Sequence, residues 1–428
     1  MTEQADGWSG PGAPPTVLPM RQRSDIIYQT LKQRLETVLP IAMREAGLDM
    51  WIILCQEDNP DPVYPTLIPM DTWCPILQIL VFYDPGEGQA IEGINISGTN
   101  TQDLYDWPYR GQIEQEQWPL LRQIIKQRDP KRIGINTGSI QWAAGGLTHN
   151  LYRQLTQALP ERYSERLTSA EALVTRWLAT LSDPELVLYD HVVHLSRSII
   201  AECYSRQVIV PGVTTTQDLV WYYWQRCADL GLQVSFKPFF GLLRSEAMRG
   251  VYGEDDQVIR PGDLLRCDVG LRYLRLNTDH QQTAYVRRDG ESDAPAGLST
   301  LFAHCAQLQD VFMDEFDQGL TGNELLTNIL ARARREGIHG AKVYSHSLGH
   351  MLHEPGPLIG LPWEQNRCDG RGDVSLRRNY CFTMELCVSG PVPEWDGQVV
   401  RLAQEEDVCF TAQGCRPING RQERLILV

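Results

Sequence analysis

The sequence lacks the features that mark membrane-spanning and secreted proteins. No apolar run approaches the roughly 20 residues of a membrane-spanning helix, and residues 1–19 are rich in glycine and proline without an apolar signal core. The eleven cysteines form no Cys-x-x-Cys pair and lie mostly in apolar runs, which argues against zinc fingers and disulfide scaffolds. We therefore expect a cytoplasmic protein with reduced thiols and a disordered tail over residues 1–20.

Positive charge is also scarce. Lysine and arginine number 39 against 54 aspartates and glutamates, which gives a formal net charge of −15. Because an acidic surface repels nucleic acid and anionic lipid, we exclude nucleic acid and membranes as the main partners. The chain has 428 residues, 42% of them hydrophobic and 22% charged, which is typical of a globular protein with two domains.

The first part of the chain alternates strand and helix patterns. Short apolar runs predict buried strands over 50–55, 75–83, 90–96 and 132–136. Apolar residues at helical spacing predict helices over 21–45, 116–127 and 151–158. This alternation indicates an α/β domain with a mixed sheet, which we place at residues 21–175. It contains no catalytic motif.

The second part, residues 176–428, reads as two successive sets of helices followed by strands. Capping boxes at Ser182–Glu185 and Thr321–Glu324 open two of its helices, and Thr214 or Thr215 opens another. Each strand set ends in candidate metal ligands. The pattern predicts two similar α/β lobes around one site.

Histidine is rare in this chain, yet three of the nine fall within fourteen residues, at His346, His350 and His353. Neutral imidazole ligates transition metals and also serves as a general acid or base near neutral pH. We interpret His350 as a structural histidine or one that supports other ligands, and we keep a substrate-binding role open for it.

Carboxylates flank the histidines on both sides. Asp268 and Asp279 precede them, and Glu385 and Glu405 follow, with Glu406 next to the last. Asp268 and Glu385 lie in apolar strands, where an unpaired charge is costly. Two aspartates, one histidine and two glutamates suit Mn, Co, Fe or Zn, and five ligands exceed what one tetrahedral ion needs. We therefore predict two divalent metal ions that hold a water between them.

Other interpretations of these carboxylates remain open at this point. Asp268 and Asp279 could be solvent-facing residues of a hairpin, and Glu405 and its acidic neighbours could form an exposed turn. Glu406 could replace Glu405 as the last ligand. His280 should point to the opposite strand face from Asp279 if the alternation of a strand holds.

The order and spacing of these residues resemble the pita-bread metallopeptidases. Asp268 and Asp279 are eleven apart, His346 and His353 are seven apart, and Glu385 and Glu405 follow. The resemblance covers about Pro184 to the C-terminus. The α/β domain ahead of it resembles the branch of Xaa-Pro aminopeptidase, prolidase and creatinase. The implied fold is a creatinase-like N-terminal domain followed by a pita-bread catalytic domain of two pseudo-symmetric lobes.

The resemblance also implies roles for individual residues. It makes Asp268, Asp279, His346, Glu385 and Glu405 the ligands of two metal ions, with Glu385 also accepting the proton of the water between them. It implies that His353 stabilises the scissile carbonyl or the tetrahedral intermediate. The implied reaction is hydrolysis of a peptide bond near the N-terminus of a small peptide, with proline after the scissile bond. The implied assembly is a homodimer.

Three positions depart from the family pattern. A substrate-binding histidine usually lies 17 or 18 residues before the first metal aspartate, where this chain has Val251 and Gly250. Leu386 stands where a proline usually follows the glutamate, and Ala403 where an arginine usually precedes the last glutamate. A creatinase-like hydrolase of a small amide or amidine is therefore the first alternative. A non-catalytic pita-bread domain that binds protein partners is the second, and the full set of ligands counts against it.

Overall fold

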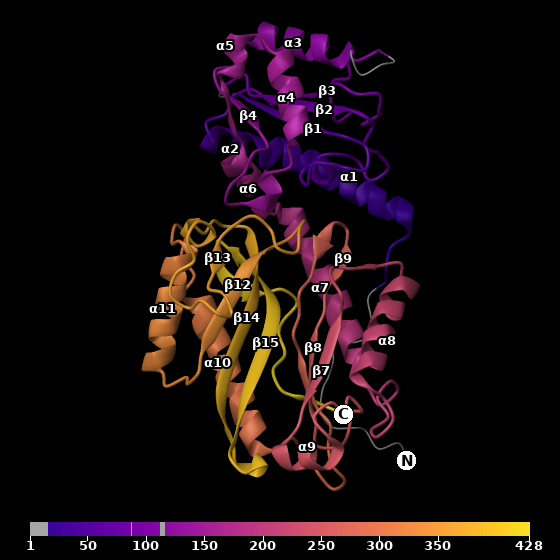
Figure 1. The fold of residues 1–428 in the computed structure, drawn as a ribbon, viewed down its shortest axis with the longest axis vertical. Helices are drawn as coiled ribbons and strands as arrows, with labels where there is room; N and C mark the ends of the chain where they lie inside the picture. Colours follow the sequence, from indigo (N-terminus) through magenta and orange to yellow (C-terminus); the bar gives the residue numbers. More distant parts are fainter. Residues whose placement is uncertain (1–15, 87, 112–115) are drawn as a thin grey trace. The chain divides into compact units, whose positions relative to one another are not determined.

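The computed structural model describes residues 16–86, 88–111 and 116–428 (Figure 1). They cluster into two compact units: one consists of Leu18–Glu185 with Glu354–Gly356, and the other contains Leu186–His353 and Pro357–Val428. Most of the predicted tail lies outside the described residues, and the first helix begins at Met20. Within the described part of the chain, no helix is long and apolar enough to cross a membrane.

The first unit is built on one mixed sheet with the strand order β3-β2-β1-β4-β5. Strands β1, β2 and β3 are antiparallel, whereas β4 and β5 run parallel to β1. Its strands are β1 (Met50–Cys55), β2 (Gln78–Tyr83), β3 (Glu92–Asn95), β4 (Ile133–Ile135) and β5 (Leu167–Ser169). Its helices are α1 (Met20–Thr37), α2 (Leu39–Glu45), α3 (Gln117–Arg128), α4 (His149–Ala158), α5 (Glu161–Ser164) and α6 (Glu171–Ala179).

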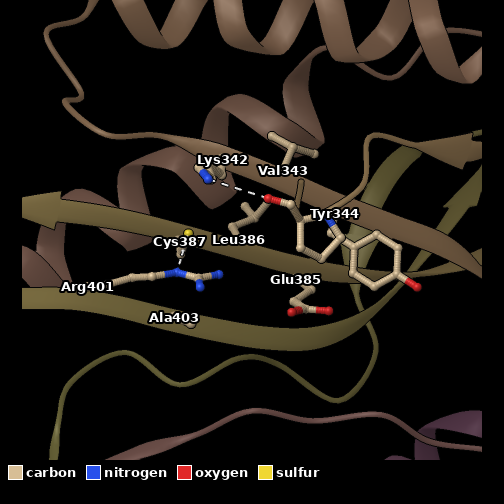
Figure 2. A pocket seen from close by; sticks show the side chains of 9 residues that line it. Lys342, Val343, Tyr344, Glu385, Leu386, Cys387, Arg401 and Ala403 are labelled. Carbon is tan, nitrogen blue, oxygen red and sulfur yellow. Dashed lines mark hydrogen bonds between the residues drawn. The ribbon is translucent and has the colours of Figure 1, made fainter. Parts of the chain in front are cut away.

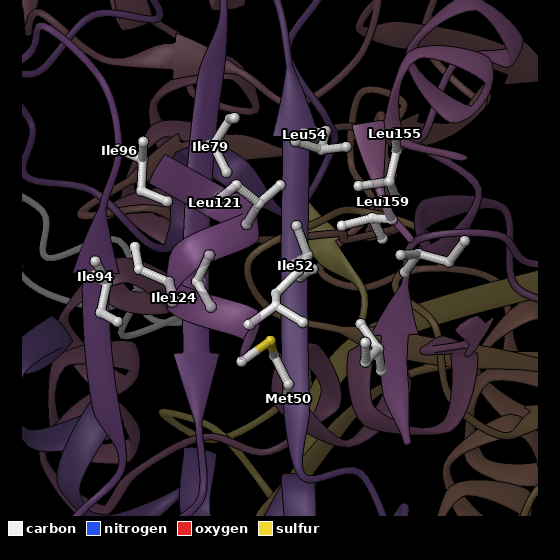
Figure 3. Packing of buried hydrophobic residues seen from close by; sticks show 14 of the residues in the cluster. Met50, Ile52, Leu54, Ile79, Ile94, Ile96, Leu121, Ile124, Leu155 and Leu159 are labelled. Atoms are coloured by element: carbon white, nitrogen blue, oxygen red, sulfur yellow. The ribbon is translucent and has the colours of Figure 1, made fainter. Parts of the chain in front are cut away.

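Apolar side chains that alternate along β1 form the core of this unit. Met50, Ile52 and Leu54 point to one face, where they pack with Leu121 of α3 and Leu155 of α4 (Figure 3). The residues between them on β1 are also buried, so the strand is apolar on both faces, as a central strand covered on both sides requires. Full burial of each such side chain contributes about 1.5–3 kcal/mol.

The predicted strands and helices of this unit are confirmed except for the long first helix. The chain over 21–45 forms two helices, α1 and α2, with Val38 between them. Pro40 occupies the first turn of α2. Proline has no N–H for an intrahelical bond, so it favours the start of a helix over its interior. The helical spacing of the apolar residues was therefore right, but the break was missed.

The second unit contains three sheets. A four-stranded sheet joins β7 (Phe239–Leu243), β8 (Leu264–Asp268), β11 (Thr283–Tyr285) and β17 (Ile426–Leu427). A five-stranded sheet has the order β13-β12-β14-β15-β16, with β12 (Lys342–Leu348), β13 (Leu358–Ile359), β14 (Tyr380–Val392), β15 (Gln398–Thr411) and β16 (Gly414–Pro417). The smallest sheet has β6 (Gln233–Val234), β9 (Leu271–Tyr273) and β10 (Leu276–Asn277).

Four long helices flank these sheets (Figure 1). They are α7 (Asp183–Cys203), α8 (Thr216–Asp229), α10 (Ala296–Asp314) and α11 (Gly322–Arg335). The short helix α9 (Glu246–Tyr252) lies near one end of β7 and β8. The capping box at Thr321 opens α11 as predicted. Of the two candidates Thr214 and Thr215, Thr215 opens α8. Directly after α7, the Tyr204 hydroxyl donates to the carbonyl oxygen of Gln282 at 3.2 Å. This contact fixes the segment that precedes β11, where the candidate ligands lie.

We predict that the buried ion pair between Arg34 and Glu185 is essential to the stability of the first unit. Arg34 Nη1 lies 2.7 Å from Glu185 Oε2, and both side chains are almost fully buried. Arg34→Ala would leave a buried carboxylate without its cation, so unfolding should become easier by about 3–5 kcal/mol.

Urea unfolding followed by tryptophan fluorescence measures this effect. The matched control is Lys32→Ala, which breaks the exposed pair between Lys32 and Asp103 and should cost at most about 1 kcal/mol. Equal losses in the two variants would contradict the prediction.

Candidate metal centre

The candidate site lies on the long antiparallel pair β14 and β15. Their register runs without interruption from Tyr380 opposite Phe410 to Val392 opposite Gln398, and it places Glu385 directly opposite Glu405. Directly opposed side chains point to the same face of an antiparallel pair, with Cβ atoms about 4.5–5.5 Å apart. The two glutamates therefore share one face of the sheet.

Asp279, His346 and Glu405 converge on one buried point. One potential ligand atom of each lies within 4.8 Å of those of the other two. His346 comes from β12, and its Nε2 lies 3.8 Å from Asp279 Oδ2. Asp279 is brought to β15 by a short β-bridge, in which the Gln281 N–H donates to the Glu405 carbonyl at 3.1 Å and the Glu405 N–H returns a bond of 2.9 Å. This bridge connects the two larger sheets of the unit.

The imidazole of His346 is oriented so that Nε2 is available as a ligand. Its Nδ1 lies 3.1 Å from the carbonyl oxygen of Ser347, and a ring nitrogen can bond to that acceptor only by donating its proton. Burial, and then the neighbouring His353, lower the pKa of His346 to about 3, so the ring is neutral at pH 7. Histidines that bind metals commonly donate their other N–H to a backbone carbonyl in this way.

Asp268 and Glu385 add two more negative charges to this group. Burial raises the pKa of Asp279 well above its usual value, and the charges of Asp268 and Glu385 raise it further. Burial also raises the pKa of Glu405 well above its usual range, with Asp279, Glu385 and Asp268 adding to the effect. The structure thus brings Asp279, His346 and Glu405 within 4.8 Å of one another. Glu385 lies opposite Glu405, and Asp268 is near enough for its charge to raise the pKa of Asp279, Glu385 and Glu405.

The charge balance and the open oxygens of this group fit divalent cations. Asp279 Oδ1 and Glu405 Oε1 are buried and have no hydrogen-bond partner among the described residues. A buried carboxylate without a partner costs several kcal/mol, on the order of 3–5 when an ion pair is broken. Carboxylate oxygens with one imidazole are a donor set that Mn, Co, Fe and Zn accept. A bound cation would supply the missing partner for both oxygens.

A second polar layer lies behind the ligands. His280 Nε2 lies 3.7 Å from Glu406 Oε2 and 3.8 Å from Asp407 Oδ2, and all three residues are buried. His280 therefore faces away from Asp279, as the strand alternation predicted. Glu405 faces Asp279, whereas Glu406 faces His280, so the geometry favours Glu405 over Glu406 as a ligand. The alternative of an exposed acidic turn is wrong, because all three acidic residues lie buried within β15.

His353 lies beside the ligand group. Its ring centroid is 4.5 Å from that of His346, and burial followed by the charge of Arg371 lowers the pKa of His353. His353 is exposed, and a neutral imidazole at this position could donate a hydrogen bond to a substrate oxygen. His350 is buried in the turn after β12, and its role in substrate binding stays a prediction.

The sequence reasoning missed two residues that hold the ligands in place. Gln281 Nε2 donates to Glu405 Oε2 at 2.7 Å, and Asp407 accepts from the backbone N–H of Asp279 at 3.2 Å. Each lies two residues from a predicted ligand, and residues two apart on a strand share a face. That spacing could have identified both residues from the sequence.

Gly250 and Val251, which stand where the family usually has a substrate-binding histidine, lie on α9, and Val251 is exposed.

This fold and this group of residues are those of a metallopeptidase. The sequence profile of metallopeptidase family M24 matches residues 188–412, which is more than half of the chain, and the chain belongs to that family. No curated protein sequence matches the chain significantly.

Several solved structures share the whole fold at low sequence identity. The X-Pro aminopeptidase of Thermotoga maritima is 16% identical, with a TM-score of 0.65, and covers 91% of this chain and 100% of its own. The prolidase of Pyrococcus horikoshii OT3 is 14% identical, with a TM-score of 0.57, and covers 95% and 100%. The N-terminal domain of the FACT complex subunit SPT16 from Cicer arietinum is 10% identical, with a TM-score of 0.58, and covers 92% and 96%. The predicted fold, an N-terminal domain followed by a pita-bread domain, is confirmed.

We predict that Glu405 and Glu406 respond differently to the same substitution. Glu405→Gln should lower metal affinity by at least about 100-fold, because loss of a supporting hydrogen bond alone costs up to that much at metal sites. Glu406→Gln is the matched control, since Glu406 has the same chemistry and burial but faces His280.

Elemental analysis after dialysis against a buffer of fixed free Mn²⁺ compares the two variants. Metal loss confined to Glu406→Gln would contradict the ligand assignment.

Proposed function

We propose that this protein hydrolyses the peptide bond that follows the first residue of a small peptide, with proline after the scissile bond. The observation that carries this proposal is the convergence of Asp279, His346 and Glu405 in one buried group. Asp268 and Glu385 would complete a site for two divalent ions. The names of two structural neighbours, an X-Pro aminopeptidase and a prolidase, support the choice of proline.

Two divalent ions at this site, with Mn, Co, Zn and Fe as candidates, would polarise the scissile carbonyl and make a water acidic enough to attack it. Glu385 is half-buried and lies at the edge of a hollow, so its carboxylate can reach both water and substrate (Figure 2). We assign it the transfer of one proton from the attacking water to the leaving amine. As the C–N bond breaks, the water oxygen stays on the new carboxyl group.

His353 is the residue to which we assign stabilisation of the developing oxyanion. Its lowered pKa leaves it neutral, so one ring N–H can donate to the carbonyl oxygen while the tetrahedral intermediate forms. Its proximity to His346 places this donor next to the ligand group. His350 would contact the substrate from the turn that connects them.

We also infer a cytoplasmic homodimer. In the part of the chain that the structure describes, the eleven cysteines form no disulfide with one another, as is usual where thiols are kept reduced. The dimer rests on the family resemblance of the N-terminal domain.

Two alternatives keep the fold and change the activity. The absence of histidine at Gly250 and Val251 favours a smaller amide or amidine substrate, as in creatinase. The likeness to the SPT16 domain is compatible with a domain that binds protein partners without catalysis. The five converging ligands count against the second alternative.

The substrate proposal predicts metal-dependent cleavage of Xaa-Pro peptides. After chelation and dialysis, added Mn²⁺ or Co²⁺ should restore release of the first residue from Xaa-Pro peptides but not from Xaa-Ala controls. Cleavage of both sets would indicate a broader aminopeptidase. A protein that binds two metals and cleaves neither would direct the search to small amides.

The role of His353 predicts a loss of turnover without a loss of metal. His353→Ala should lower kcat by about 100-fold or more, the usual effect of removing a group that moves a proton or stabilises charge. His304→Ala, which changes an exposed histidine on α10, is the control and should retain full activity. If His353→Ala kept the wild-type kcat with its metals bound, this role would be wrong.

A further inference from the structure

A cavity of about 410 Å³ opens next to the ligand group in the second unit. It is lined by residues of β7, β8, β11 and β15, among them Phe239, Leu264, Arg266, Thr283, Arg401 and Ala403. One wall is apolar, and two arginines provide the positive charge. A smaller hollow shares Arg401 and Ala403 and reaches Glu385 (Figure 2).

The strand alternation places both arginines on the faces that carry the ligands. Arg266 lies two residues before Asp268 on β8, and Arg401 lies four residues before Glu405 on β15. Residues separated by an even number of positions point to the same side of a strand. Ala403 occupies the position between Arg401 and Glu405, and its short side chain leaves space for a ligand there.

The closest contacts of both arginines are with neutral groups, although their charges also limit the rise in the pKa of Glu385. The guanidinium carbon of Arg266 lies 5.4 Å from the ring centroid of Phe239, and Arg401 Nε donates to Cys387 Sγ at 3.1 Å. Across residues 16–86, 88–111 and 116–428, neither arginine forms an ion pair with a carboxylate. Most of their N–H donors are therefore available to an anion, and the guanidinium fork matches the geometry of a carboxylate.

The register of β12 and β14 shows on which side of Glu385 these arginines lie. Tyr344 pairs with Glu385, and Lys342 pairs with Cys387, whereas Arg401 pairs with Ser389. His346 lies two residues beyond Tyr344 in the other direction. Arg401, and with it Arg266 in the same cavity, therefore lies on the opposite side of Glu385 from His346 and its neighbour His353. A substrate whose scissile bond lies at Glu385 can extend toward the arginines.

We propose that Arg266 and Arg401 form a carboxylate-binding subsite that determines specificity for acidic substrates. This inference rests on the proposed peptidase function and adds the chemical class of the substrate. Without such a subsite, the four carboxylates at the centre and the net charge of −15 would repel an anionic substrate. The carboxylate could belong to the side chain of the first residue or to the peptide that follows the scissile bond.

Two pairs of substrates distinguish between these two positions of the substrate carboxylate. The first pair, Glu-Pro-Gly amide and Gln-Pro-Gly amide, differs only in a carboxylate on the first residue. The second pair, Ala-Pro and Ala-Pro amide, differs only in a carboxylate beyond the scissile bond. The metal-loaded wild-type protein should show a kcat/KM at least about tenfold higher for the acidic member of one pair, as expected for a charged hydrogen bond. Arg401→Met and Arg266→Met should each reduce that ratio several-fold. The control Arg206→Met changes an exposed arginine outside the cavity and should leave the ratio unchanged.

Equilibrium binding provides a readout that does not depend on turnover. With hydrolysis suppressed by Glu385→Gln, calorimetry should give a Kd at least about tenfold lower for the acidic peptide than for its neutral partner. Adding Arg401→Met should remove the difference. If the metal-loaded protein cleaves neither acidic nor neutral Xaa-Pro peptides, the proposed function fails while calorimetry still tests the subsite. Equal binding of acidic and neutral peptides, or a preference that persists in both arginine variants, would overturn the subsite.

Discussion

Repulsion among four carboxylates at one site is the constraint on which the second unit depends. Asp268, Asp279, Glu385 and Glu405 come from different strands or turns. Burial raises the pKa values of all four, and the charges of neighbouring carboxylates raise those of Asp279, Glu385 and Glu405 further. In the absence of a cation this arrangement opposes folding as the pH rises, because the folded state favours the protonated forms more than the unfolded chain does. The rest of the unit must hold these charges together.

Several features of the fold oppose this repulsion without neutralising it. The Gln281–Glu405 bridge joins the two larger sheets where the charges meet, and Gln281 also donates from its side chain to Glu405. Asp407 accepts from the Asp279 backbone. These bonds fix the positions of the oxygens and leave one oxygen of Asp279 and one of Glu405 open. A site in which positions are fixed before the cation arrives binds that cation with little further loss of entropy.

Local sequence patterns predicted much of this structure because its strands are strongly apolar and its helices carry capping boxes. Met50–Cys55 was predicted to the residue, and the five candidate ligands were proposed from order and spacing. The choice between Glu405 and Glu406 was not possible from sequence, since it depends on the register of β15 against β14 and on the bridge to Gln281. The roles of Arg266 and Arg401 were missed for the same reason, because strands far apart in the chain form their cavity.

The distribution of charge along β14 gives the site a direction. Neutral imidazoles lie on one side of Glu385, and two guanidinium groups lie on the other, so the two halves of a bound peptide meet different chemistry. The imidazoles can donate hydrogen bonds to a carbonyl without attracting a full negative charge, whereas the arginines attract one strongly. A substrate with a single carboxylate would therefore bind in one orientation more readily than in the reverse. In a centre whose own ligands are nearly all anionic, positive charge outside the ligand group is what can set the orientation of the peptide.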